Sequence, residues 1–255
     1  LAPASSEGLR PFEWEDPGDK ELRRTPLHVF HAKRAKKLIP FAGWEMPVWY
    51  TNSSIESEHQ AVRKTAGLFD VGHMGVFGVS GPDAGEFLDA VVTGNATRLP
   101  VGRAAYMYLL DANGRCMDDL ILYRIEAERF MVVVNAANAQ KNWAWLAGVN
   151  DGIYQIIAGD SSARLPVRTT LVDLRSPEAG NAGRVDLAFQ GPESRDVLAG
   201  IVGSEDERRA LAAMSANDVG AFTVAGAQVE IARTGYTGEA VGFEVFVHPE
   251  EATII

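Results

Sequence analysis

The chain has 255 residues, of which 46% are hydrophobic and 23% charged, a balance typical of a soluble globular protein with a sizeable core. Its 34 acidic residues exceed its 24 basic residues and give a formal net charge of -10, which disfavours binding to nucleic acid or to an anionic membrane. The single cysteine, Cys116, excludes an internal disulfide, no Cys/His spacing indicates a metal site, and no apolar run is long enough to cross a bilayer, so we expect a cytoplasmic protein.

The N-terminal part of the chain divides into an arm and the start of a folded domain. Residues 1–24 are rich in Pro, Gly, Ser and acidic residues without apolar periodicity, which predicts an extended arm. A helix is predicted to begin at Pro26. Its apolar face comprises Leu27, Phe30, Ala35 and Leu38. The segment "IPFAGWEMPVWY" that follows contains two prolines and a glycine, which excludes a long helix and predicts a buried loop or short strand.

One sequence pattern occurs twice. "VSGPDAGEFLDAVV", beginning at Val79, and "FQGPESRDVLAGIV", beginning at Phe189, both read as a strand, a Gly-Pro pair, an acidic residue and a helix. Proline at the first helical position and an acidic residue in the first turn favour a helix N-terminus. The repeat predicts an α+β protein built from two related halves.

Strand-like runs form two groups along the chain, the first of them between the two copies of this pattern. "AAYMYLL", "RCMDDLILYRI" and "RFMVVVNAA" form a first group, in which Asn113-Gly114 is a strong hairpin signal. The later group comprises "TLVDLRS", "RVDLAFQ", "FTVAGAQVEIART" and "FEVFVHP". The last residues resemble the start of another helix, and the chain begins without Met, so we expect a piece of a longer protein.

Two adjacent carboxylates interrupt the second of these strands. Because side chains alternate across a strand, Asp119 shares a face with Tyr123, while Asp118 points to the other face. A hairpin loop of two or four residues would also place Tyr106 and Tyr108 on the face of Asp119, whereas a three-residue loop would reverse this parity. One carboxylate among three tyrosines suits a flat heteroaromatic ligand that donates hydrogen bonds. The alternative is a solvated strand carboxylate on an aromatic sheet face.

Three further motifs carry polar side chains. "RTGYTGE", followed by "AVGFE" and ending at Glu244, indicates either a turn that presents Tyr236 to a ligand or an ordinary glycine hairpin. "VVVNAAN" ends a strand with Asn135, whose amide could bind a polar ring edge or close a turn. "GLFDVGHMG" brings Asp70 near His73, but no serine in a nucleophile elbow accompanies them, so the histidines are interpreted as structural.

Seven motifs taken in order resemble the T-protein (aminomethyltransferase) family of the glycine cleavage system. They are "RTPL", "FAGWEMP", "GLFDVGHMG", "DDLILY", "VVVNAAN", "QGP" and "RTGYTGE…GFE", and they span Arg24 to about Pro249. The resemblance implies a folate-binding fold over residues 25–255, with two related α+β subdomains around a central cavity. The family's C-terminal β domain is expected to be missing.

The same resemblance implies a set of site residues. Asp119 matches the family's essential carboxylate. The residues that match folate-binding positions are Met74, Tyr106, Asp119, Tyr123, Asn135, Tyr236 and Glu244. The chain departs from the family pattern at Gly72, where Ser is usual, in the one-residue-longer "GEAVGFE", and in the longer region 149–184.

The implied reaction transfers a one-carbon unit from the aminomethyl-lipoyl group of a carrier, the H-protein, to tetrahydrofolate with release of ammonia. One alternative is the folate-binding domain of a sarcosine or dimethylglycine dehydrogenase-type demethylase, and a second is a non-catalytic folate-binding scaffold of the iron–sulfur maintenance type. A third is a binding module that has kept the fold and lost folate. Relatives of the scaffold type carry a Cys in the segment equivalent to "RTGYTG", where this chain has Gly235 before Tyr236.

Overall fold

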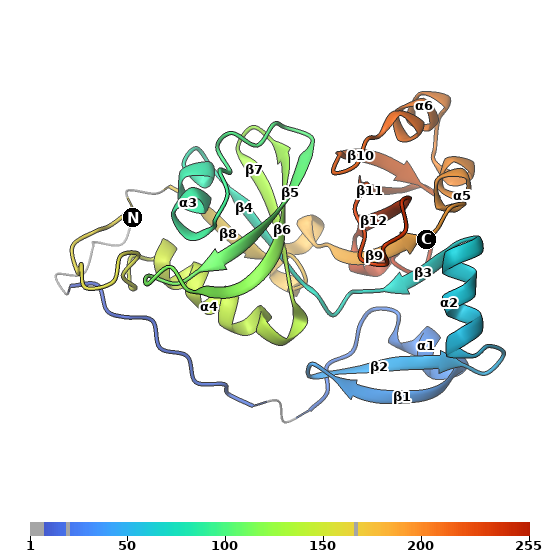
Figure 1. The fold of residues 1–255 in the computed structure, drawn as a ribbon, viewed down its shortest axis with the longest axis horizontal. Coiled ribbons are helices and arrows are strands. Elements are labelled where there is room, and N and C mark those ends of the chain that lie inside the picture. The colour runs from blue at the N-terminus through green and yellow to red at the C-terminus, as the bar shows by residue number, and fades with distance from the viewer. Residues whose placement is uncertain (1–7, 19–20, 166–167) are drawn as a thin grey trace. The chain divides into compact units, whose positions relative to one another are not determined.

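A computed structural model describes residues 8–18, 21–165 and 168–255. The chain divides into two compact units, which Figure 1 shows. Unit 1 comprises Gly75–Asp173 and the N-terminal segment up to Gly18, and unit 2 comprises Asp19–Met74 and Leu174–Ile255. No helix within the described ranges is both long enough and apolar enough to cross a bilayer.

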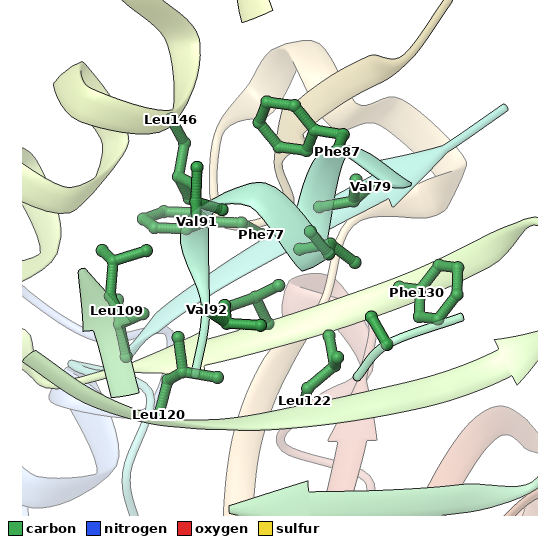
Figure 2. Packing of buried hydrophobic residues seen from close by; sticks show 14 of the residues in the cluster. Phe77, Val79, Phe87, Val91, Val92, Leu109, Leu120, Leu122, Phe130 and Leu146 are labelled. Atoms are coloured by element: carbon green, nitrogen blue, oxygen red, sulfur yellow. The ribbon is translucent and has the colours of Figure 1, made fainter. Parts of the chain in front are cut away.

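Unit 1 is built on a five-stranded antiparallel sheet with the strand order β5-β6-β7-β4-β8. Its strands are β4 (Gly75–Ser80), β5 (Arg103–Leu110), β6 (Cys116–Glu126), β7 (Arg129–Val134) and β8 (Thr170–Asp173). The helices α3 (Ala84–Val91) and α4 (Ala139–Asn150) pack on one face of this sheet, and a short 3-10 helix, η1 (Ala136–Asn138), precedes α4. Figure 2 shows side chains from α3, α4 and the strands interlocking in the core between them.

Alternation along the strands determines which apolar side chains of the sheet in unit 1 pack against the helices. Leu120 and Leu122 of β6 and Phe130 and Val132 of β7 project to the same side and are buried in the core cluster. The described arm residues 8–18 contain no helix or strand, yet Phe12 packs its ring against Trp145 at a centroid distance of 5.3 Å. Residues 8–18 therefore lack regular secondary structure but pack against unit 1, and the extended arm over 1–24 stays a prediction.

Unit 2 repeats this architecture with the strand order β10-β11-β12-β9-β3. Its strands are β3 (Gly67–Asp70), β9 (Val185–Gln190), β10 (Val219–Val224), β11 (Ala227–Ala232) and β12 (Gly242–Val247). The helices α5 (Ser194–Ile201) and α6 (Glu205–Ala213) cover one face, and unit 2 also contains α1 (His28–Arg34), α2 (Ile55–Lys64) and the 3-10 helices η2 (Pro177–Ala182) and η3 (Pro249–Glu251). The predicted α+β class with two related halves is confirmed.

The Gly-Pro repeat forms the same corner in both units. β4 leads into α3 through Gly81, and β9 leads into α5 through Gly191, with φ values of 118° and 126° that side chains other than glycine rarely adopt. A Cβ atom at either glycine would collide with a backbone carbonyl oxygen, that of Arg168 or of Thr65. Each corner therefore requires glycine on both conformational and steric grounds.

The helix predicted from Pro26 is shorter than expected. α1 ends at Arg34, and Ala35–Phe41 form β1, which pairs with β2 (Trp44–Tyr50) as a separate two-stranded sheet. Strand pairing overrides the weak helical periodicity because Ala42 and Gly43, with φ values of 48° and 79°, form a tight reversal that brings the aromatic-rich β2 back along β1. Of the two alternatives for "IPFAGWEMPVWY", a buried loop or a short strand, the structure has strands, namely the end of β1 and β2.

A buried chain of hydrogen bonds connects α1, β2 and β3. The hydroxyl of Tyr50 lies 2.7 Å from Nδ1 of His31, and Nε2 of His31 lies 2.8 Å from Oδ2 of Asp70. The Thr25 hydroxyl donates to the same Oδ2 at 2.5 Å, and the Gly72 N–H donates to Oδ1 at 2.9 Å. Burial opposes ionisation of Asp70, but these hydrogen bonds outweigh it and lower the pKa of the carboxyl group. Burial, with the charges of Glu58 and Asp70, raises the pKa of Tyr50 to about 12, so the arrangement does not activate a nucleophile.

We expect Asp70→Asn to lower the free energy of unfolding at pH 7 by about 2 kcal/mol, because hydrogen bonds to a buried charge are lost. The lowered pKa of Asp70 means that its contribution is present at neutral pH and is lost as pH falls through the folded-state value. The difference between wild type and variant, measured by urea unfolding, should therefore shrink below about pH 4. Tyr50→Phe, which removes only the outer hydroxyl, should cost about 1 kcal/mol. An equal loss in both variants at every pH would contradict this account.

Candidate functional site

In the structure, Asp119 lies on the face of β6 that strand alternation predicts. Tyr108 pairs with Asp119, Tyr106 with Ile121 and Ala104 with Tyr123, so the three tyrosines and Asp119 project to the same side of the sheet. This side is opposite to the core that α3 and α4 cover. Asp118 projects toward the helices instead.

The hairpin loop has three residues, yet the strands pair in the register expected for a loop of two or four residues. The Asp111 N–H donates to the Arg115 carbonyl, which leaves a three-residue loop of 112–114 with Gly114 at a φ value of 71°. Such a loop alone would reverse the parity. An irregularity between Leu109 and Leu110 shifts the register by one residue, and this shift restores the pairing that two- or four-residue loops would give.

Asp119 is held by side chains from two neighbouring strands. The Tyr106 hydroxyl donates to Oδ2 at 2.9 Å, and the Asn135 amide donates to Oδ1 at 2.7 Å. The hydrogen bond to Asp119 raises the pKa of Tyr106 well above its usual value. Tyr106 and Tyr108 are 59% and 43% exposed, and their rings meet edge to face with centroids 5.4 Å apart. A half-exposed carboxylate therefore lies beside exposed aromatic surface.

Asp118 is buried and receives four N–H donors on the helix side of the sheet. The Asn135 backbone N–H lies 3.2 Å from Oδ2, and the Asn135 side-chain amide lies 2.8 Å from Oδ1. The amides of Asn138 and Asn142 donate at 2.8 Å and 2.6 Å. Charge-assisted hydrogen bonds of this number compensate the cost of burying a carboxylate. Asp118 thereby anchors Asn135 in the position from which it reaches Asp119.

The role of Asp118 and Asn142 was not predicted from sequence. Asn142 lies on α4 four residues after Asn138, so the two amides share one helix face. The four-residue spacing of the two asparagines, together with the carboxylate pair in an apolar strand, is the sequence pattern that indicates this role. Lys141 adds to the same corner, because its ammonium donates to the Met117 carbonyl at 3.0 Å and to the Asn138 side-chain oxygen at 3.1 Å.

A second group of predicted residues meets in unit 2. The Tyr236 hydroxyl donates to Oε1 of Glu244 at 2.6 Å, and the Thr234 hydroxyl donates to Oε2. Glu244 is fully buried on β12, whereas Tyr236 is 52% exposed in the loop before it. Although "GEAVGFE" has one extra residue, Glu244 pairs with Ala188 in strand register and contacts Tyr236.

Gln190 accounts for two of the glycines around this loop. Its amide donates to the backbone carbonyls of Thr234 and Phe243 at 3.2 Å and 3.1 Å. A Cβ atom at Gly235 or Gly242 would collide with that amide group. These glycines are required by close approach, and the "QGP" and "RTGYTGE" motifs are therefore parts of a single contact.

Three other predicted positions have different surroundings. Tyr123 shares the face of Asp119 but is fully buried. Met74 lies in the turn after β3, where its N–H donates to the Val71 carbonyl at 2.9 Å, and its role in binding stays a prediction. Asp70 lies 2.8 Å from His31, a residue 39 positions away in sequence, and the interpretation of His73 as structural stays a prediction. Burial lowers the pKa of His73.

The sequence matches the model of the family described as the GCVT N-terminal domain over residues 27–255. The chain belongs to this family. The aminomethyltransferase of Symbiobacterium thermophilum is 38% identical over 244 residues, which cover 93% of this chain and 57% of that protein. The aminomethyltransferase of Bacillus cereus strain AH187 is 40% identical over 231 residues, which cover 91% and 56%. The chain spans about half the length of these GCVT relatives.

Solved structures lead to the same GCVT fold. The glycine cleavage system aminomethyltransferase T from Bartonella henselae superposes with a TM-score of 0.72 at 34% identity, over 91% of this chain and 55% of that chain. The predicted T-protein fold is confirmed. Heterotetrameric sarcosine oxidase from Corynebacterium sp. U-96 gives a TM-score of 0.50 at 13% identity, over 91% and 90%, which is a likeness of fold alone.

The two adjacent carboxylates should respond differently to the same substitution. Asp118→Asn replaces a buried acceptor of four N–H groups, so we expect it to lower the free energy of unfolding by about 3 kcal/mol. Asp119→Asn affects a half-exposed group and should cost less than about 1 kcal/mol. Urea unfolding of both variants at one pH provides the comparison. If Asp119→Asn were the more destabilising change, the assignment of Asp118 as the structural anchor would be wrong.

Proposed function

We propose that this chain contributes the folate-binding part of an aminomethyltransferase that transfers a one-carbon unit to tetrahydrofolate. The observation that supports the proposal most directly is the Asp119 carboxylate, which accepts hydrogen bonds from Tyr106 and Asn135 and lies beside exposed tyrosine rings. Names of relatives that are 36 to 40% identical support the type of reaction.

The residues around Asp119 suit a reduced pterin. A pterin is a flat ring system with ring N–H and amide groups at its edges, so it needs aromatic surface and an acceptor in one place. Tyr106 and Tyr108 offer the surface, and the carboxylate offers the acceptor. The Asn135 amide holds the carboxylate from one side, which leaves it oriented rather than free to rotate. In unit 2, we assign Tyr236, Glu244 and Met74 to folate binding on the family resemblance.

The chemical demand on the chain is to orient a nitrogen nucleophile and to stabilise positive charge. Tetrahydrofolate supplies two nitrogens whose N–H protons end on the released ammonia and on the carrier thiol when the carbon changes partners. Asp119, as a fixed carboxylate, holds such an N–H by hydrogen bond, stabilises the cation that develops and receives a proton. Tyr106 keeps the second carboxylate oxygen in place.

The donor in the proposed reaction is an aminomethyl-lipoyl group on an H-protein carrier. The proposal therefore includes a lipoylated partner, in keeping with the similarity to the glycine cleavage system aminomethyltransferase T from Bartonella henselae. The predicted cytoplasmic location stays a prediction. The sarcosine oxidase likeness concerns fold alone and does not favour the demethylase reading.

Asp119→Asn keeps the size of the side chain and removes its charge. In the full-length protein we expect it to lower the rate of folate-dependent ammonia release from aminomethylated carrier by about 10²- to 10⁴-fold. Tyr106→Phe should lower the rate by about tenfold, because it removes one hydrogen bond to the carboxylate. A near wild-type rate in Asp119→Asn would contradict the assigned role.

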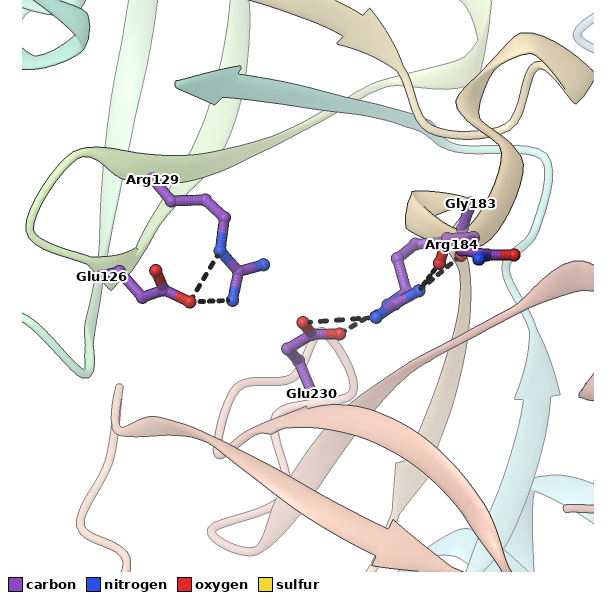
Figure 3. A network of polar contacts seen from close by, with 6 residues as sticks. Glu126, Arg129, Gly183, Arg184 and Glu230 are labelled. Carbon is purple, nitrogen blue, oxygen red and sulfur yellow. Dashed lines mark hydrogen bonds and ion pairs between the residues drawn. The ribbon is translucent and has the colours of Figure 1, made fainter. Parts of the chain in front are cut away.

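Glu126→Gln is the matched control for this experiment. Glu126 ends the same strand as Asp119 and forms a surface ion pair with Arg129 at 2.8 Å, which Figure 3 shows. Exposed pairs contribute little to stability, so this variant should keep wild-type activity and folding. Equal losses in Glu126→Gln and Asp119→Asn would indicate a general effect of removing charge from β6.

A further inference from the structure

Three buried carboxyl groups share the sheet face of unit 2 that is turned away from α5 and α6. Glu230 pairs with Phe246, which pairs with Asp186, while Glu244 pairs with Ala188. Side chains two residues apart on a strand point to the same side, so Asp186, Glu230 and Glu244 lie on one face, with Asp186 and Glu244 as diagonal neighbours on adjacent strands. Asp186 and Glu244 are fully buried, and Glu230 is nearly so.

The internal repeat shows that the fold does not require these carboxyl groups. Asp186 is the second residue of β9, and the second residue of β4 in unit 1 is Val76, which is also fully buried. Glu244 faces the fourth residue of β9, and its counterpart facing the fourth residue of β4 is Met131. The same sheet therefore folds in unit 1 with apolar side chains where unit 2 carries acids. The fold therefore does not by itself explain the acids in unit 2.

Two of the three carboxylates have partners that compensate their charge. The Arg184 guanidinium binds Glu230 at 2.6 Å, as Figure 3 shows. Glu244 accepts hydrogen bonds from the hydroxyls of Thr234 and Tyr236. Both oxygens of Asp186 lie without a hydrogen-bond donor among the described residues. No group of three or more His, Cys, Asp or Glu side chains in the described part of the chain is placed to hold a metal ion.

A proton bound between Asp186 and Glu244 removes the repulsion between these two buried carboxylates. Two ionised carboxylates have no donor between them and repel each other, so such a buried pair is stable only when it shares a proton. Complete burial raises the pKa of Asp186, and the negative charges of Glu244 and, more weakly, of Asp70 add to this shift. Glu230 faces the same region but is paired with Arg184, whose guanidinium also donates to the carbonyls of Gly183 and Asn181.

We infer that Asp186 is a positioning residue, which carries a proton at neutral pH and donates it in a hydrogen bond to Glu244. Thr234, Tyr236 and Asp186 then all direct O–H groups at one ionised Glu244 carboxylate and hold it in a single orientation. The positioning role rests on the proposed function, in which Glu244 binds the folate. The protonated state of Asp186 does not depend on that function.

The protonated state is tested by infrared spectroscopy, without folate, on the full-length protein. At pH 7 we expect wild type to show the C=O stretch of a buried protonated carboxyl group and both Asp186→Asn and Asp186→Val to lack it. The Val variant reproduces the residue that unit 1 has at this position, so it should fold. It should also unfold at a higher temperature than wild type at pH 8, because a raised carboxyl pKa in the folded state makes stability fall as pH rises from the unfolded value toward the folded one. An unchanged carboxyl band would overturn the inference.

The positioning role is tested by titrating tetrahydrofolate against the same three proteins between pH 6 and pH 9. We expect wild-type affinity to fall as pH rises, because Asp186 loses its proton. Asp186→Asn keeps an N–H donor that does not titrate, so its affinity should be nearly independent of pH. Asp186→Val should bind about tenfold more weakly than wild type at pH 6, which is the cost of one hydrogen bond to a charged group.

The infrared experiment and the tetrahydrofolate titration together distinguish which of the three claims fails: the protonated state, the positioning role or the proposed function. Equal affinities and equal pH profiles in all three proteins would overturn the positioning role. No binding of tetrahydrofolate by wild type would overturn the proposed function and the positioning role with it, while the infrared band would still report the proton on Asp186. A merely structural Asp186 would change the unfolding temperature but would leave the pH profile of binding unchanged.

Discussion

The arrangement in unit 1 depends on one amide group that binds two carboxylates. Consecutive residues of a strand project to opposite faces, so Asp118 and Asp119 would not ordinarily share a partner. Asn135 reaches both because β7 stops pairing with β6 at Val134, opposite Leu120, and the chain then turns into η1. At this end of the ladder the Asn135 side chain contacts Asp118 on the core side and Asp119 on the other side.

The contacts of Asn135 give the two acids different roles. Asp118 is surrounded by amides from the start of α4, which makes its burial tolerable and fixes the end of β7. Asp119 gains an oriented amide donor without being buried itself. A carboxylate that is oriented yet accessible is what a site for a ligand with N–H donors needs. Substitution of Asp118 and of Asp119 can therefore change the free energy of unfolding by different amounts, although the two acids are adjacent in sequence.

The two units show that one backbone arrangement can present different chemistry on the same face. Both have five antiparallel strands in the same relative order and the same glycine corner before the first covering helix. On the face away from the helices, unit 1 carries tyrosines and Asp119, whereas unit 2 carries Asp186, Glu230 and Glu244. Apart from Asp118, the helix-facing sides are apolar in both, because burial against helices constrains composition there.

Sequence alone determined the features that depend on short-range chemistry: the α+β class, the duplicated strand-glycine-helix corner and the alternation that puts Asp119 and Tyr123 on one side of their strand. Local signals did not determine the end of α1, since pairing of β1 with β2 replaced the helical periodicity after Arg34. The tertiary structure also decided the parity at Asp119 through a register shift that compensates a three-residue loop. It alone showed that Asp70 pairs with His31, that Asn142 supports Asp118 and that Asp186 faces Glu244. These contacts join residues 24 to 58 positions apart, and contacts across such separations follow from strand order and helix packing, which no local pattern encodes.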